Sequence, residues 1–327
     1  MSTIYDVAAA AGVNASTVSR ALNSPDRVSP VTRTKVQDAA RELNYRANIG
    51  ASKLRSGGPQ AIGLVVSGVT EPAKAKMLSG IEDAAASHGC LVLVSDAHNS
   101  GDQEREAAQR LASVSNGVIF VEPTLPDEDL QELARLKDTV IIHRDVPGIA
   151  QVGKAPASGL ADTIRYLTGL GHRLVTYVTA PIRSPAMADE VQSLDEQCVW
   201  SGVRLTRITA VGPGPDAGRR VARQVRATGC TAVVCAGDLL AIGIMQELQA
   251  GGVDVPHEIS VIGWGDIEGA SLTTPPLSTI RPNGAATGRL AVDNLVELWR
   301  RHPPSAYTCA PAPELIVRGS SGAAPRA

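Results

Sequence analysis

Two patterns of apolar and polar residues divide the chain near residue 60. Before it, apolar side chains recur at helical spacing in short windows. After it, apolar runs alternate with helical windows, which is typical of parallel sheets covered by helices on both faces. The expected strands are 61–67, 90–96, 117–122, 139–144, 174–180, 204–211, 231–237 and 259–265. The helical windows between them include 73–88, 157–170, 216–228 and 238–250.

Eight strands with their helices exceed one small domain. We therefore expect the roughly 270 residues after the N-terminal segment to form two doubly wound, parallel-sheet lobes of the α/β class. In such sheets, ligands bind at the carboxyl ends of the strands.

The N-terminal segment carries the signals of three helices. Thr3 can cap a first helix, with Asp6 three residues later. Gly12 supplies a break before Asn14 caps a second helix that runs to about residue 23. Ser29 followed by Pro30 begins the third.

Apolar residues of the first two helices can share one small core, namely Val7, Val13, Val18 and Leu22. In the third helix the residues that recur at helical spacing are Val31, Val36, Ala39 and Leu43. The second helix then directs another set of residues away from the core, namely Ala15, Ser16, Ser19, Arg20 and Asn23. A recognition helix that enters a major groove has this arrangement.

The charge distribution agrees with a DNA-binding head. Residues 1–60 contain eight Lys and Arg against four Asp and Glu, whereas the remainder contains 23 against 29. The net charge of −2 thus averages a basic head and an acidic body, and a basic head suits phosphate contacts. A solvated helical bundle without a DNA partner explains the charge alone equally well.

The head closely resembles the LacI/GalR family of bacterial transcription regulators. The match covers 4–8, 11–13 and 16–23, and continues at 28–29, 32–33, 36 and 43–45 in one register. The resemblance implies a sequence-specific, dimeric repressor whose affinity for double-stranded operator DNA depends on a small-molecule effector. It also implies DNA contacts by residues of the head, namely Tyr5, Ala15, Ser16, Thr17, Ser19, Arg20, Asn23, Ser29 and Thr32.

The family's hinge helix is matched in part. Asn48, Ala51 and Leu54 stand where the family places a helix that enters the minor groove, with the leucine as a wedge that unstacks one base step. The usual proline is replaced by Ala47, and Gly50 weakens the helix. We expect a hinge that folds only on DNA, and a plain interdomain linker is the alternative.

The resemblance also divides the chain. It implies a helix-turn-helix domain over 1–46, a hinge helix and linker over 47–59, and a periplasmic-binding-protein-like core for ligand binding and dimerisation over 60–327. Three crossings between the lobes are expected near 155, 281 and 310. Lobe one would then comprise 60–155 with 281–309, and lobe two 156–280 with 310–319.

Composition and motifs argue against other classes. No signal peptide or membrane span is found, so we expect a cytoplasmic protein. The five cysteines are scattered, and neither they nor the six histidines show ligand spacing, so we expect no disulfide framework, metal or cofactor. Phosphate-loop, nucleophile-elbow and zinc-protease signatures are missing, so we expect no enzyme and no catalytic residue. The terminal segment has no leucine heptads, which predicts a dimer and not a tetramer.

The strand ends supply the candidate effector residues. The resemblance suggests Arg144, Asp238 and Asp266, to which we add Trp264, Arg183 and Glu190 from strand-end segments of lobe two. A charged residue there can also cap a helix, and for Asp238 that alternative is at least as good.

The chain departs from the sugar-responsive members of the family. Glu190 replaces an effector-binding arginine, Gly237 an amide, Gly265 a carboxylate, and Pro213 a stacking ring. These changes predict that the effector is not a neutral sugar held in the usual manner, and favour a charged or less polar ligand. Loss of ligand control is the alternative.

Overall fold

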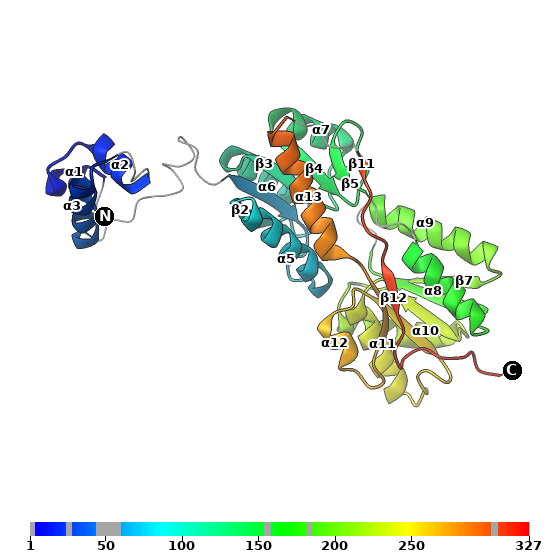
Figure 1. Cartoon of the computed structure of the whole chain (residues 1–327). Coiled ribbons are helices and arrows are strands. Elements are labelled where there is room, and N and C mark those ends of the chain that lie inside the picture. The colour runs from blue at the N-terminus through cyan, green and yellow to red at the C-terminus, as the bar shows by residue number, and fades with distance from the viewer. Residues whose placement is uncertain are drawn as a thin grey trace. The chain divides into compact units, whose positions relative to one another are not determined.

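The chain forms two compact units, residues 1–60 and 61–327. The computed structural model describes residues 4–23, 28–43, 60–153, 158–181, 185–301 and 307–326 (Figure 1). Thr3 and the predicted hinge residues Asn48, Ala51 and Leu54 lie outside these ranges.

The first unit contains helices α1 (Ile4–Ala11), α2 (Ala15–Asn23) and α3 (Pro30–Glu42). Gly12 turns the chain after α1 with a φ of 64°, a left-handed conformation that glycine adopts without strain. The side-chain oxygen of Asn14 accepts the backbone N–H of Thr17 at 2.9 Å, as an N-cap does. Ser29 caps α3 in the same way, through the N–H of Thr32. The predicted starts of α2 and α3 are confirmed.

The three helices bury a small common core. Val7, Val18 and Val36 are fully buried in it, and Val13 is packed against it. Leu22 has a side chain outside the described set. Val31 lies off this core and is 68% exposed, because it stands five positions before Val36, which places it about 140° around the helix.

The second unit contains two six-stranded sheets. The first has the order β11-β5-β4-β3-β1-β2, and the second β12-β10-β9-β8-β6-β7. All the pairings are parallel except that of β10 with β12. The strands of the first sheet are β1 (Ala61–Val66), β2 (Leu91–Asp96), β3 (Gly117–Val121), β4 (Asp138–Ile142), β5 (Ala150–Val152) and β11 (Tyr307–Thr308). Those of the second are β6 (Leu174–Thr179), β7 (Arg204–Thr209), β8 (Ala232–Cys235), β9 (Ser260–Trp264), β10 (Ser278–Arg281) and β12 (Glu314–Ile316).

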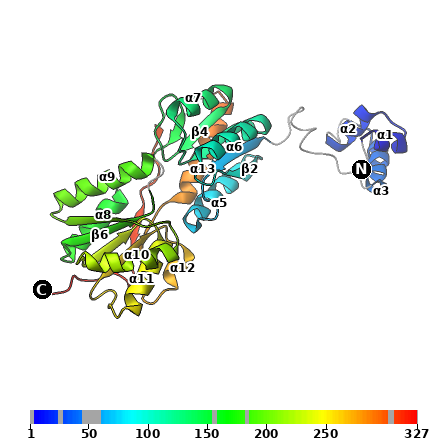
Figure 2. The same cartoon turned by 180° about the vertical axis from the view of Figure 1, so that it is seen from behind.

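Helices cover both faces of each sheet, and each sheet with its helices is called a lobe below (Figures 1 and 2). Lobe one carries α5 (Pro72–Ser87), α6 (Gly101–Val114), α7 (Asp127–Leu136) and α13 (Gly284–Trp299). Lobe two carries α8 (Ser158–Gly169), α9 (Pro185–Trp200), α10 (Pro215–Ala227), α11 (Asp238–Ala250) and α12 (Glu268–Ser271). Each lobe buries two apolar clusters, one on either side of its sheet. None of the helices described is long and apolar enough to cross a bilayer.

The sheet topology confirms the predicted α/β class and all eight predicted strands. Four further strands, β5, β10, β11 and β12, were not predicted. The chain passes from the first sheet to the second after β5, returns through α13 after β10, and passes again between β11 and β12. At the second passage α13 packs closely on α5, because a Cβ at Gly80 would lie 2.2 Å from the carbonyl oxygen of Ala285.

The C-terminal residues are part of lobe two. Ser320 exchanges two hydrogen bonds with the backbone of Val261, at 2.7 and 2.6 Å. The carbonyl of Gly322 lies 3.0 Å from Nε2 of His172, whose side chain is fully buried. Burial lowers the pKa of His172 and keeps the ring neutral. The C-terminal segment is therefore bonded to β9 and to the residues just before β6, as part of lobe two.

Candidate functional site

The second helix of the head presents a polar surface. Arg20 and Ser16 are exposed on α2, and Tyr5 on α1 is 73% exposed. The hydroxyls of Ser16 and Thr17 both donate to the Asn14 side chain at 2.7 Å, so Asn14 fixes the first turn of α2. An exposed guanidinium on a helix fixed in this way can donate two hydrogen bonds to a guanine edge.

The other residues that were predicted to contact DNA differ in their surroundings. Ala15 packs partly against the head core, and the Ser29 and Thr32 hydroxyls lie 2.8 Å apart. The side chains of Ser19 and Asn23 fall outside the described set. The structure thus brings Tyr5, Ser16 and Arg20 to the surface of the head.

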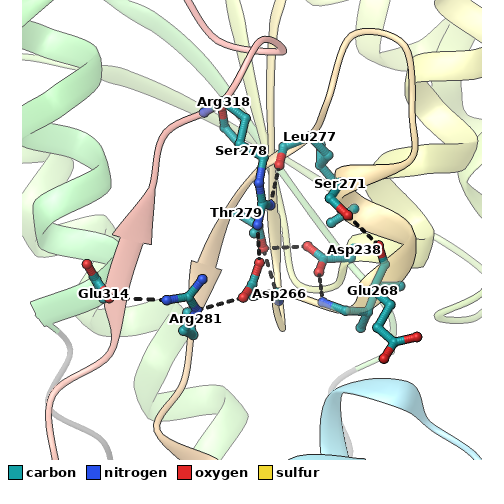
Figure 3. Close-up of polar contacts among 12 residues, drawn as sticks. Asp238, Asp266, Glu268, Ser271, Leu277, Ser278, Thr279, Arg281, Glu314 and Arg318 are labelled. Carbon is teal, nitrogen blue, oxygen red and sulfur yellow. Dashed lines mark hydrogen bonds and ion pairs between the residues drawn. The ribbon is translucent and has the colours of Figure 1, made fainter.

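In lobe two, the predicted residues Asp238 and Asp266 lie together (Figure 3). Asp238 begins α11 and is buried, and its Oδ1 accepts the Thr279 hydroxyl at 2.5 Å. Its Oδ2 accepts the N–H of Ile267 at 2.9 Å. Burial raises the pKa of Asp238. This side chain ties the start of α11 to β10 and to the segment after β9, while the N-cap of α11 is Gly237.

Asp266 is held by two arginines that the sequence analysis did not identify. Its Oδ2 accepts Nε of Arg281 and its Oδ1 accepts Nη2 of Arg318, both at 2.6 Å (Figure 3). Burial raises the pKa of Asp266, but these bonds outweigh it and lower the pKa to about 2. Arg281 also lies 3.6 Å from Glu314, and Arg318 donates to the carbonyl of Leu277. The acid is therefore ionised, and each of its oxygens is bonded to an arginine.

Two glycines lie at these strand ends, at positions where the resemblance led us to expect polar residues. Gly265 has a φ of 127°, and a Cβ there would lie 3.0 Å from the Cβ of Ala73 in α5. An acid at this position would be strained by its backbone as well as crowded. Gly237, in contrast, has open space where a Cβ would point.

The remaining effector candidates have different surroundings. Trp264 is partly buried against the lobe two cluster that α8 and α9 cover. Arg144 is buried, and its Nη1 donates to the carbonyls of Pro123 and Leu125 at 2.9 and 2.6 Å. Its Nη2 bonds to Asp127 in α7, so Arg144 holds the segment between β3 and α7. Residue Arg183 and the side chain of Glu190 lie outside the described set.

The strand ends of lobe one carry a second charged cluster. Glu122 and His143 follow β3 and β4, and both have left-handed backbones, with φ of 50° and 62°. Oε1 of Glu122 lies 3.2 Å from Nδ1 of His143, and its Oε2 lies 3.8 Å from Nζ of Lys74. Burial raises the pKa of Glu122, but His143 and Lys74 outweigh it and hold the pKa at about 2.

Lys74 is anchored within this cluster. Its Nζ donates to the carbonyl of Ser67 at 2.5 Å and lies 3.2 Å from Glu71. Close by, Asp96 accepts the N–H groups of Gly68 and Val69, each at 3.0 Å. The expected strands 90–96 and 117–122 end at Asp96 and Glu122, whereas Lys74 and His143 were not predicted from the sequence. Paired strand-end residues on adjacent strands were the signal that could have revealed His143.

Comparison with known proteins identifies the family. Residues 3–48 match the model described as bacterial regulatory proteins, lacI family, and residues 164–321 match a periplasmic binding protein-like domain. The chain is 32% identical over 306 residues to the HTH-type transcriptional regulator GalS of Salmonella typhimurium, with 90% of this chain and 88% of GalS covered. The chain belongs to the LacI family.

Further similarities extend over this LacI-family protein's whole length. It is 29% identical to the HTH-type transcriptional regulator GalR of Escherichia coli, with 98% of this chain and 96% of GalR covered. A crystal structure of the Lac repressor dimer bound to operator and an anti-inducer matches with a TM-score of 0.86 at 26% identity, and covers 98% of this chain and 99% of that one. The protein is accordingly a DNA-binding transcriptional repressor with an effector-binding core.

Proposed function

We propose that the protein acts as a homodimer in which each head reads one half of a near-palindromic operator through α2. The observation that carries this proposal is the exposed Arg20 on a helix whose start is fixed by Asn14. A single head of three short helices reads only a short half-site, so two copies are needed for specificity. Leu54 as a minor-groove wedge stays a prediction from the sequence.

The edge of the first sheet supports the dimer. Strand β2 lies at this edge, and its Leu91 and Val94 are 58% and 49% exposed. An apolar edge strand that stays open to solvent favours association with another chain. We assign a second copy as the partner. Sedimentation of the purified chain is expected to show a dimer, and a stable tetramer would contradict the proposal.

We further propose an effector that is charged or less polar than a sugar. The two acids of lobe two are already bonded to Arg281, Arg318, Thr279 and a backbone amide. They are therefore poor acceptors for sugar hydroxyls, and each unpaired buried hydroxyl would cost about 1–3 kcal/mol. In lobe one Glu122 stays ionised at neutral pH. A contribution of Arg144, Arg183 or Glu190 to this site remains a prediction.

Thermal-shift screening of the full chain tests the effector class. The panel contains neutral mono- and disaccharides, sugar phosphates, small acids and small amines. A ligand from the charged groups is expected to raise the melting temperature. If that ligand is an amine, the variant Glu122→Gln is expected to reduce the rise, because Glu122 is ionised at neutral pH. A strong shift with an unmodified sugar that Asp266→Ala abolishes would contradict the proposal.

We propose that the protein is neither an enzyme nor a protein that only binds a ligand. It acts on chromosomal DNA and is therefore expected in the cytoplasm. A gel shift on the DNA flanking its own gene separates this function from the alternative, a ligand-binding protein or enzyme with a vestigial head. A specific shift is expected, with competition by unlabelled site and not by random DNA. No specific shift with any member of the ligand panel would favour the alternative.

A further inference from the structure

A charged contact joins the two lobes at Asp266. Lys76 lies in α5 of lobe one, and its Nζ donates to the carbonyl oxygen of Asp266 at 3.1 Å. The same Nζ lies 3.4 Å from Oδ2 of this residue. Lys76 thus contacts both the main chain and the carboxylate at the end of β9.

The contact lies where the chain passes between the lobes. Arg281, which holds Asp266, is the last residue of β10, and α13 of lobe one begins three residues later at Gly284. Arg318 follows β12, the strand that receives the chain when it returns. Asp266 is therefore bonded to the last residue of β10 and to a residue two positions beyond the end of β12, next to two of the passages between the lobes.

Lys76 is coupled to the body of lobe one by close helix packing. A Cβ at Gly288 would lie 2.5 Å from the carbonyl oxygen of Met77, and one at Gly284 would lie 3.1 Å from its nitrogen. Backbones that approach this closely leave little room for α5 to slide on α13. A movement of α5 away from Asp266 therefore requires a displacement of the helix pair, and with it of lobe one.

The contact is also easy to break. Asp266 is 7% exposed, whereas the side chain of Lys76 is 50% exposed. The two arginines satisfy the carboxylate without Lys76, so departure of the lysine leaves no buried charge unpaired. The ammonium group then regains water.

We propose that Lys76 and Asp266 form an interlobe latch that favours the lobe arrangement of this structure over one in which the lobes have moved apart. Its consequence for DNA rests on the proposed function. The latch itself is a property of the core. Loss of a partly exposed ion pair is expected to change the ratio of lobe arrangements about two- to fivefold.

Spin-label distances between the lobes test the latch in the full-length protein. Labels are placed at Arg110→Cys in α6 and Arg223→Cys in α10, both exposed, with the exposed Cys309 replaced by serine. Dilution with unlabelled protein removes distances between subunits. Lys76→Met removes the charge and Lys76→Glu reverses it, while Lys137→Met is the control because Lys137 ends α7 away from Asp266.

The two lysine variants are expected to shift the distance distribution in the same direction, Lys76→Glu further than Lys76→Met, with the control unchanged. Coincident distributions for Lys76→Glu and the parent would overturn the latch. Operator binding is measured on the same samples. If no sample binds specific DNA while the distances still shift, the proposed function fails and the latch stands.

Discussion

Replacing Asp266 with asparagine keeps the shape of the side chain and removes the charge that two arginines share. The carboxylate accepts two charge-assisted hydrogen bonds of 2.6 Å while being 7% exposed. Such bonds contribute about 1.5–3 kcal/mol each, but Arg281 is 42% exposed and regains water when its partner is lost. The lowering of the pKa from 3.8 to about 2 corresponds independently to about 2 kcal/mol. We therefore expect Asp266→Asn to lower the free energy of unfolding by about 2–4 kcal/mol at pH 7.

Urea unfolding followed by tryptophan fluorescence measures this loss, since Trp264 is two residues away. The matched control is Asp216→Asn, which removes an 80% exposed aspartate that also pairs with an arginine and should change stability by less than about 0.5 kcal/mol.

The pH dependence gives a second check on Asp266. A carboxyl with a lowered pKa stabilises the fold above its unfolded pKa, and that contribution is lost as the pH falls from about 4 towards 2. The difference in the free energy of unfolding between the parent and Asp266→Asn should therefore decrease over the same pH range. If this difference equals that of the control variant Asp216→Asn, or does not change with pH, the charge of Asp266 does not stabilise the fold.

Two further changes test the interior of the core. Gly80→Ala should destabilise the fold by about 1–3 kcal/mol, because its Cβ would meet the backbone of Ala285. The control Gly169→Ala, at a helical glycine with open space around it, should be neutral or stabilising. Equal effects of the two variants on the melting temperature would argue against the close α5–α13 contact. His172 is buried and has a lowered pKa, so the unfolded chain takes up a proton before the folded chain as the pH falls through 6.5. The free energy of unfolding then decreases by up to about 1.4 kcal/mol for each pH unit below 6.5. His172→Gln should lack this decrease between pH 8 and 5.5, and a decrease that persists in the variant would show that another group causes it.

The sequence predicted the α/β class because the central strands are buried on both faces and appear as continuous apolar runs. Strands β5, β11 and β12 were missed because they are only two or three residues long, too short for a periodic signal. Strand β10 has four residues, as the predicted β8 does, but Ile280 is its only apolar residue, so it gives no apolar run. In the head, caps at Asn14 and Ser29 were predicted because their hydrogen bonds are local in sequence.

The candidate site was predictable only in part, because its contacts join residues that lie far apart in the sequence. The rule that ligands gather at strand ends pointed to Asp238 and Asp266. Their partners were not apparent, because Lys76 is 190 residues from Asp266 in the sequence and Arg318 is 52. Gly265 was identified from the sequence as a strand-end position, but its positive φ and the closeness of Ala73 became apparent only from the fold.

Base reading by the exposed face of α2 can be measured with the variant Arg20→Ala. Affinities of the full-length protein are measured by titration on its selected site and on random DNA of equal length at the same salt concentration. If Arg20 donates to a base edge, the variant loses about 1–3 kcal/mol on the selected site and little on random DNA. Unchanged affinity for the selected site, or an equal loss on both DNAs, would contradict base reading by this helix.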